Sequence, residues 1–292
     1  MIKALSPWII ASRLKTLPAA ISPVLVGSAL AYSSINEIQI SIFLSIILAS
    51  IFIQIGTNLS NDLSDFIKGT DNEERLGPIR AAQTGLLTIN QLKLGIIISF
   101  GLSILFGVYL VSIGGYIIVL IGVFSIISGI LYTAGPFPLG YNGLGDFFVF
   151  IFFGIIAVSG TFYLNTLIFN FESLICGIMM GSLSTSILVV NNIRDANTDV
   201  KTGKKTLAVI LGIKFSKIEF SILVLLPFCL IFYLYLLINK LAIFLSFFTL
   251  PIAFNLVYKI YHRTGSDLNN VLFKAARLLF VFSLLLSLGL IV

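Results

Sequence analysis

The feature that most constrains the fold is a succession of continuous apolar runs, each about as long as a membrane helix. A helix needs about 20 predominantly apolar residues to cross the hydrocarbon core of a bilayer. Such runs fill most of the 292-residue chain, whose mean hydropathy is +1.09. Only 10% of the residues are charged, against about 25% in a typical soluble domain. Because the runs lack the alternation of a membrane β-strand, the sequence predicts an all-α integral membrane protein.

The runs predict nine transmembrane helices in a single domain that comprises residues 1–292. The first run follows two basic residues, as the apolar part of a signal peptide would. It is nevertheless long enough to span a bilayer, and further spans follow, so we expect it to be the first membrane helix. The helices are expected near residues 17–35, 41–61, 92–112, 115–133, 144–163, 170–192, 216–238, 240–259 and 272–291.

The Lys and Arg residues predict the orientation in the membrane. With nine crossings, all of the 18 basic residues except Lys240 fall on the same side as the N-terminus. Loops rich in Lys and Arg stay on the cytoplasmic side of the membrane. The sequence therefore predicts a cytoplasmic N-terminus and a C-terminus outside. The net charge of +6 follows from this topology and indicates no nucleic-acid partner.

A polar and acidic stripe marks the cytoplasmic end of the second predicted helix. Its members recur at three- and four-residue spacing, so they share one face if the run stays helical. Ionisable groups in a membrane helix are costly and usually functional. The stripe consists of Gln54, Asn58, Asn61, Asp62 and Asp65.

A second acidic stripe lies far downstream, at the end of the sixth predicted helix. Asn191, Asp195 and Asp199 are four residues apart and precede a basic loop. Mg²⁺ is usually held by one or two carboxylates, with phosphate oxygens and water completing its shell. We therefore expect Asp65, Asp195 and Asp199 to hold Mg²⁺ against a diphosphate at the membrane surface.

Neighbouring side chains could contact the same substrate. Amides add neutral oxygens and donors, and Lys or Arg side chains neutralise phosphate charge. The alternative, in which the acids only pair with loop cations, fits Glu73 and Glu74 best because they lie beyond the stripe. The candidate substrate ligands are Asn58, Asn61, Asp62, Asn191 and Asn192, together with Lys68, Arg80, Arg194, Lys201 and Lys204.

Two further pairs of residues allow more than one interpretation. Arg13 and Lys15 precede the first helix, where they either anchor the topology or hold a carboxylate or phenolate of an acceptor. Tyr132 and Asp146 flank a Gly- and Pro-rich loop that predicts an irregular lid. They either orient an acceptor and act on its hydroxyl proton, or only pack the loop and cap a helix.

Four stretches together resemble the UbiA superfamily of membrane prenyltransferases, and within it the menaquinone-pathway branch. They run from the first predicted helix to the start of the seventh, whereas the last three helices match only as apolar spans. The stretches are RLKTLPAA from Arg13, NDLSDFIKGTDNEERLGPIRA from Asn61, YTAGPFPLGYNGLGD from Tyr132 and NNIRDANTDVKTGKKTLAV from Asn191.

The resemblance implies nine helices around a central cavity in a bacterial inner membrane, with Mg²⁺ as the cofactor. It implies a polyprenyl diphosphate donor and 1,4-dihydroxy-2-naphthoate as acceptor, whose carboxylate is replaced with release of CO₂ and diphosphate to give demethylmenaquinone. Several superfamily members have a basic residue in the loop that follows Tyr132; this loop has none. By position, the metal-site residues are Asn61, Asp65 and Asp71 in the first motif and Asn191, Asp195 and Asp199 in the second.

Three alternatives remain at this stage. A phytyl-transferring relative of phylloquinone synthesis differs only in its donor. A cation-coupled transporter would use the stripes as a midplane ion site, but both stripes lie at helix ends and continue into basic loops. A CDP-alcohol phosphotransferase clusters its aspartates in one extended motif, whereas this chain has two separated ones.

Overall fold

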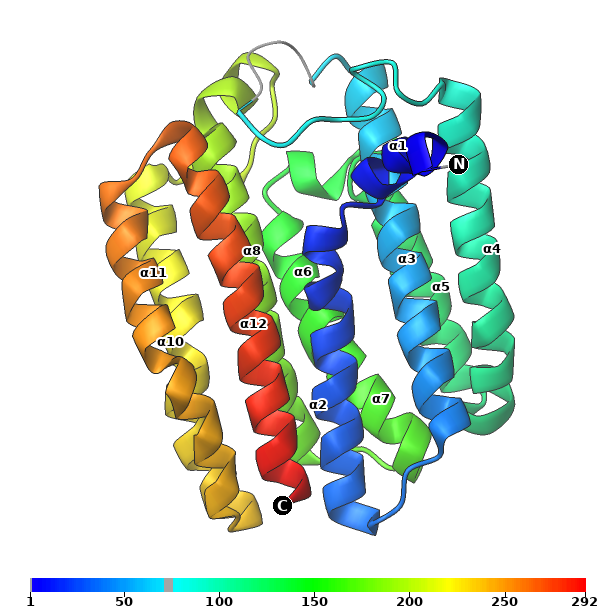
Figure 1. Ribbon diagram of the computed structural model, residues 1–292, viewed down its shortest axis with the longest axis vertical. Coiled ribbons are helices and arrows are strands. Elements are labelled where there is room, and N and C mark those ends of the chain that lie inside the picture. The colour runs from blue at the N-terminus through cyan, green and yellow to red at the C-terminus, as the bar shows by residue number, and fades with distance from the viewer. Residues whose placement is uncertain (1, 71–75) are drawn as a thin grey trace.

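Long helices that run side by side account for most of the structure (Figure 1). The computed structural model describes residues 2–70 and 76–292. In the first half of the chain the helices are α1 Ile2–Ser12, η1 Leu14–Thr16, α2 Leu17–Ile35, α3 Ile40–Ile67, α4 Ile89–Gly114 and α5 Tyr116–Leu131. The second half comprises η2 Leu139–Tyr141, α6 Gly145–Phe150, the π-helical η3 Ile151–Ile156, α7 Ala157–Thr166, α8 Phe171–Lys201, α9 Leu207–Ile210, α10 Ile213–Ile238, η4 Leu241–Thr249, α11 Leu250–His262, η5 Gly265–Asp267 and α12 Leu268–Ile291.

The predicted all-α membrane fold is confirmed. Within the described residues, eight helical stretches are long and apolar enough to cross a membrane, and the 16-residue α5 is a shorter ninth. The N-terminus and the longer loops lie at one end of the bundle, and the C-terminus lies at the other (Figure 1). Among the described residues, every Lys and Arg except Lys240 belongs to the N-terminal end of the bundle, as the predicted topology requires.

Several helix boundaries differ from the prediction. The α3 and α8 helices continue to Ile67 and Lys201, beyond the end of their apolar runs. Both polar stripes therefore lie on helices. Their side chains find partners at the end of the bundle, and this allows the two helices to continue. The sequence pattern did not predict α1, which lies across the N-terminal end of the bundle (Figure 1). Trp8 and Ala11 pack α1 against Leu59 of α3 and Gly95 of α4.

The two motif helices end in the same way. After α3, Gly69 has a φ of +69°, and after α8, Gly203 has a φ of +74°. The next residue donates its N–H back to the carbonyl of an aspartate: Thr70 to Asp65 at 3.0 Å, and Lys204 to Asp199 at 2.9 Å. This is the Schellman arrangement, which needs a left-handed residue such as glycine. It fixes where each acidic turn stops and where the following loop begins.

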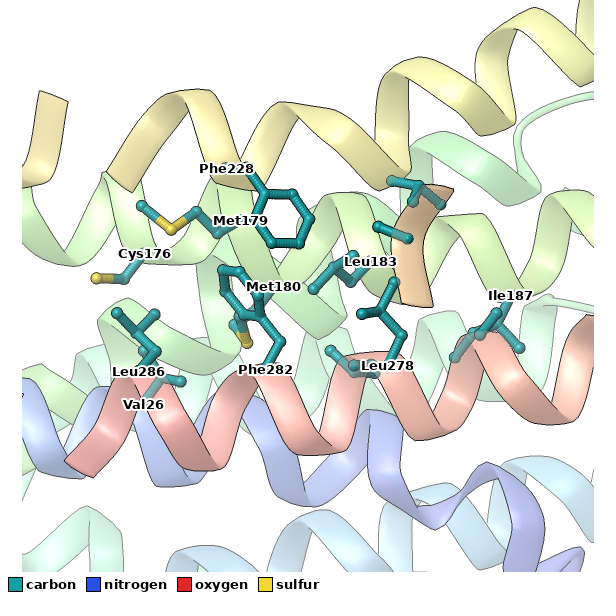
Figure 2. Packing of buried hydrophobic residues seen from close by; sticks show 14 of the residues in the cluster. Val26, Cys176, Met179, Met180, Leu183, Ile187, Phe228, Leu278, Phe282 and Leu286 are labelled. Atoms are coloured by element: carbon teal, nitrogen blue, oxygen red, sulfur yellow. The ribbon is translucent and has the colours of Figure 1, made fainter. Parts of the chain in front are cut away.

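The last helix closes the bundle against the first membrane helix, because α12 packs on α2 as well as on α8 and η4. The buried side chains of α2, α8, α10 and α12 form one continuous hydrophobic core (Figure 2). Met179, Met180 and Leu183 of α8 face Phe228 of α10 and Phe282 of α12 in this core. The core fills this half of the bundle and holds α8 in place.

Small residues allow the stretch that comprises α6 and η3 to approach α8 closely. A Cβ added at Gly154 would lie 2.4 Å from the carbonyl oxygen of Gly177 and from the Cα of Gly181. Such contacts between backbones are typical of packed membrane helices. They bring Asp146, at the start of α6, close to the acidic end of α8.

We expect Gly154→Ala to destabilise the protein by about 1–3 kcal/mol, because the methyl group would meet backbone atoms that cannot move independently. Thermal unfolding of the purified protein in detergent should show a transition several degrees lower. Gly101→Ala on α4 is the control, since a Cβ there has no atom within 4 Å. Equal transitions in both variants would contradict this packing argument.

Candidate active site

The carboxylate of Asp65, near the end of α3, lies between a guanidinium and a phenol. Arg80 donates from Nη2 to Oδ2 at 2.9 Å, and Tyr141 donates from its hydroxyl to Oδ1 at 2.8 Å. The Nζ of Lys68 lies 4.6 Å from the centroid of the Tyr141 ring and donates to the carbonyl of Thr133 at 2.6 Å. The first motif thus presents a buried carboxylate with cations on either side.

The other members of the first stripe hold the surrounding segments. Asn61 accepts a hydrogen bond from the hydroxyl of Thr133 at 2.8 Å. Asp62 accepts the backbone N–H groups of Ala81 and Ala82, at 3.1 and 3.4 Å, and so fixes the turn that follows Arg80. Asp62 therefore positions the arginine that pairs with the carboxylate one helical turn further along α3.

The amide nitrogens of Gln54 and Asn58 bind the break between α1 and α2. Both donate to the hydroxyl of Thr16, at 3.2 and 3.1 Å, and Asn58 also donates to the carbonyl of Ser12 at 3.0 Å. Arg13 lies in this break with a φ of 50°. These two amides, one of which the sequence suggested as a substrate ligand, tie the start of α2 to α3.

In the second motif, Asp195 pairs with its own neighbour. The Nε and Nη2 of Arg194 donate to the two oxygens of the Asp195 carboxylate at 2.7 and 2.6 Å. The same guanidinium donates to Asn191 at 2.6 Å and to Asn269 of α12 at 2.7 Å. This arginine is therefore bound on all sides and orients the carboxylate beside it.

Asp199 lies one turn further along α8 and faces the first motif. The Nζ of Lys204 lies 3.8 Å from its Oδ1, and it also lies 5.4 Å from the centroid of the Tyr141 ring. Asp65 and Asp195 are close enough to Asp199 for their charges to interact. Tyr141 therefore connects the two motifs, with its hydroxyl on one carboxylate and its ring beside the lysine of the other.

A further buried acid, Asp146, lies next to the second motif. The carboxylate oxygens of Asp146 are both 3.5 Å from the amide nitrogen of Asn192. Asp146 also interacts electrostatically with Tyr132 and with Glu219 of α10. Tyr132 and Asp146, which flank the lid loop, thus lie close together beside the acidic end of α8.

The pKa of the Tyr132 phenol is raised above its ordinary value of 10.0, chiefly by burial, and the charge of Asp146 adds to this effect. Tyr132 is therefore a neutral phenol at pH 7 and can donate a hydrogen bond. Burial lowers the pKa of Lys68, and the charge of Asp65 opposes this shift.

The remaining candidate residues either lie at the edges of the site or are not among the described residues. Arg13 is close enough to Asp62 and Tyr132 for its charge to act on both. Lys15 instead lies over the ring of Phe273 on α12, 5.5 Å from its centroid. Lys201 is exposed at the end of α8. Asp71, a predicted metal ligand, lies outside the described residues.

A cavity of about 680 Å³ extends from this site into the membrane-spanning part of the bundle. Residues of α2, α3, α4, α5 and the α6–α7 stretch line it, and most of them are aliphatic or aromatic. Gln54 and Tyr132 belong to its wall, so the cavity reaches the polar cluster. The cavity occupies one side of the bundle, because the core of α8, α10 and α12 fills the other.

The donor set suits Mg²⁺ bound together with a substrate. The Oδ2 of Asp199 is buried and has no hydrogen-bond partner among the described residues, as expected for an oxygen that a cation would engage. Within the same part of the chain, no three His, Cys, Asp or Glu side chains gather closely enough to hold an ion alone. Phosphate oxygens would then complete the shell of ions held by Asp65 and by the Asp195/Asp199 pair.

Sequence reasoning missed several residues of the cluster. Tyr141 and Thr133 lie in the lid loop, where nothing in the local sequence distinguishes them from packing residues. Glu219 is an isolated acid in an apolar run, which is a recognisable signal. Asn269 belongs to a pair of polar residues near the start of the last helix, a weaker signal of the same kind.

The fold and the site define a multi-span membrane enzyme with an acidic, oxygen-rich centre at the mouth of an apolar cavity. The chain belongs to the UbiA prenyltransferase family, which matches residues 20–285.

Individual relatives agree with this assignment. The 1,4-dihydroxy-2-naphthoate octaprenyltransferase of Haemophilus influenzae is 38% identical over 215 residues, which are 71% of this chain and 70% of that protein. The 2-carboxy-1,4-naphthoquinone phytyltransferase of Synechocystis is 30% identical over 212 residues, 71% of this chain and 66% of that protein. A UbiA homologue from Archaeoglobus fulgidus, solved with GPP and Mg²⁺, has a TM-score of 0.69 at 16% identity and covers 98% of this chain and 99% of its own. This last likeness shows the fold.

We expect Tyr141→Phe to lower kcat/KM for prenyl transfer about tenfold, because a hydrogen bond to a charged carboxylate is lost. Tyr141→Ala should lower it further, since the ring beside Lys68 and Lys204 is lost as well. Steady-state assays in membranes would measure both effects. Tyr116→Phe, at the far end of the bundle, is the control. Full activity in both Tyr141 variants would show that this residue does not connect the motifs.

Proposed function

We propose that this protein transfers a polyprenyl group from polyprenyl diphosphate to 1,4-dihydroxy-2-naphthoate, with loss of CO₂ and diphosphate, to give demethylmenaquinone in its reduced, quinol form. The observation that carries the proposal is the meeting of two acidic helix ends, with Arg and Lys side chains between them, at the mouth of an apolar cavity. The naphthoate octaprenyltransferase of Haemophilus influenzae supports the choice of acceptor. Residues 1–292 would act as a single transmembrane prenyltransferase domain.

The diphosphate would lie between the ends of α3 and α8. Asp65, Asp195 and Asp199 would hold Mg²⁺, which would supply Lewis-acid stabilisation to the diphosphate oxygens. Arg80 and Lys204 approach the same space and would stabilise the negative charge that develops as the allylic C–O bond breaks. The bonding electron pair leaves with the diphosphate, so an allylic cation forms at the mouth of the cavity.

The apolar cavity would hold the isoprenoid tail and exclude water from this cation. Water would otherwise capture the cation and release a free prenyl alcohol. The aromatic carbon that bears the carboxylate attacks the cation and forms the new C–C bond. The carboxylate then leaves as CO₂, and its bonding electrons restore the aromatic ring without a net proton transfer.

The acceptor would lie between the α1–α2 break and the lid loop. Arg13 would pair with its carboxylate or phenolate before the reaction. Tyr132, as a neutral phenol, can donate a hydrogen bond to an acceptor oxygen and so orient the ring. Asp146 and Asn192 lie behind Tyr132 and support this side of the site.

The active-site end of the bundle would face the cytoplasm of a bacterial inner membrane, with the C-terminus outside. The distribution of Lys and Arg residues supports this orientation. Both substrates carry negative charge at the end that reacts, and this is the end of the bundle where the basic residues gather.

The alternatives have unequal support. A phytyl-transferring enzyme would use the same site with another tail, and the Synechocystis relative is the observation in its favour. Family membership argues against the cation-coupled transporter and the CDP-alcohol phosphotransferase. Membrane assays with 1,4-dihydroxy-2-naphthoate and labelled diphosphates of several chain lengths, with and without Mg²⁺, would decide among these functions.

We expect Asp65→Asn and Asp199→Asn, as well as Asp195→Ala, to lower Mg²⁺-dependent product formation by more than about a hundredfold. The proteins should still insert into the membrane, because these changes remove charge from polar positions. Chelation of divalent ions should abolish the activity of the unaltered protein. Glu172→Gln, at the opposite end of α8, is the matched control. Activity within a few-fold of the unaltered protein in the Asp65 and Asp195 variants would refute the site.

We also expect Gly122→Phe to favour donors with shorter isoprenoid tails. Gly122 lines the cavity, and an added Cβ there has no atom within 4 Å, so the ring can enter the space for the tail. Transfer from octaprenyl diphosphate should fall at least about tenfold relative to transfer from geranyl diphosphate, since the longer tail would overpack the site. Gly101→Phe, outside the cavity wall, should leave the ratio unchanged. An unchanged ratio in the Gly122 variant would place the tail elsewhere.

A further inference from the structure

The guanidinium of Arg194 is anchored from outside its own helix. Its side chain is fully buried, and two of its nitrogens hold the carboxylate of Asp195. The remaining nitrogen, Nη1, donates to the Oδ1 of Asn269 at 2.7 Å. Asn269 is the second residue of α12, so the last helix helps to fix the orientation of this arginine.

The same asparagine also holds the first motif. Its Nδ2 donates to the carbonyl oxygen of Leu76 at 2.9 Å, in the segment that leads to Arg80. Arg80 in turn pairs with Asp65. A chain of contacts therefore runs from Asp195 through Arg194 and Asn269 to the segment that carries the partner of Asp65.

The contacts of Asn269 differ from those of an ordinary helix cap. A capping asparagine accepts a hydrogen bond from a backbone N–H of its own helix. The Oδ1 of Asn269 instead accepts from an arginine of α8, and its Nδ2 donates to a loop 193 residues away in sequence. Both functional atoms of the amide are thus used to join other elements.

We propose that Asn269 is a positioning residue for the divalent ion and the diphosphate, holding the two acidic motifs in register from the last helix. This inference rests on the proposed function. A bidentate arginine occupies one lone pair on each oxygen of Asp195 and leaves the others for an ion. Asn269, together with Asn191, fixes the arginine and thereby the direction of those lone pairs. Groups that orient metal ligands in this way typically change metal affinity by about 10–100-fold when they are removed.

The test measures Mn²⁺ binding by electron paramagnetic resonance, with purified full-length protein and inorganic pyrophosphate as the probe. Asn269→Ala should raise the Kd for Mn²⁺ at least about tenfold. In prenyl-transfer assays the Mg²⁺ concentration at half-maximal rate should rise by the same factor, while kcat at saturating Mg²⁺ stays within about threefold. Asn270→Ala is the matched control, because Asn270 is the exposed neighbour on the same turn, and it should bind as the unaltered protein does.

Two further variants separate positioning from folding. Asn269→Asp keeps an acceptor for Arg194 but loses the donor to the Leu76 carbonyl, so it should restore part of the Mn²⁺ affinity. Asn269→Leu fills a similar volume without polar atoms and should restore none. If the alanine variant does not fold, the comparison of these two decides the question.

Unaltered Mn²⁺ affinity in Asn269→Ala, or equal affinities in Asn269→Asp and Asn269→Leu, would overturn the inference. A protein that binds Mn²⁺ with pyrophosphate but forms no prenylated naphthoate would instead contradict the proposed function. The comparison of the Asn269 variants would still stand in that case, so the two failures are distinguishable.

Discussion

Negative charge gathered at the C-terminal ends of two helices is the constraint on which the rest of the structure depends. The C-terminus of a helix carries about half an elementary negative charge, and α3 and α8 add buried carboxylates to it. Protein sites for phosphate normally use helix N-termini, whose polarity is opposite. A diphosphate can therefore enter here only together with cations. Arg80, Arg194 and Lys204 supply fixed positive charge, and a divalent ion would supply the rest.

The two halves of the bundle serve this site differently. The filled core around α8, α10 and α12 holds the second motif rigidly and ties it to the last helix. The side lined by α2, α3, α4, α5 and the α6–α7 stretch leaves a cavity, and its motif helix α3 also makes polar contacts with the α1–α2 break and with the turn after Arg80. The proposed chemistry would take place where the two halves meet, at Tyr141. A filled side and a hollow side would thus allow one site to be both well positioned and able to admit a long tail.

The sequence predicted much of the fold, because hydropathy and the positions of Lys and Arg are local properties. It also located both acidic stripes, since helical spacing brings Asp195 and Asp199 to one face without tertiary information. It did not predict α1, whose place depends on the contact of Trp8 with Gly95. It did not reveal the roles of Tyr141 and Asn269 either. Those residues matter because of the segments they meet, and such meetings depend on helix packing that no local pattern encodes.

The length of α5 has a consequence for the membrane itself. With 16 residues and a rise of about 1.5 Å per residue, the helix is about 24 Å long, whereas the hydrocarbon core is about 30 Å thick. It follows α4 through a tight turn at the far end, so it stops well before the level at which the longer α4 begins. With the α4–α5 turn at the far edge of the hydrocarbon core, the lid loop would therefore start below the headgroups. Such hydrophobic mismatch is relieved by thinning the lipid around the short helix, which would bring headgroups, and any amphiphile dissolved among them, down to the level of Tyr132.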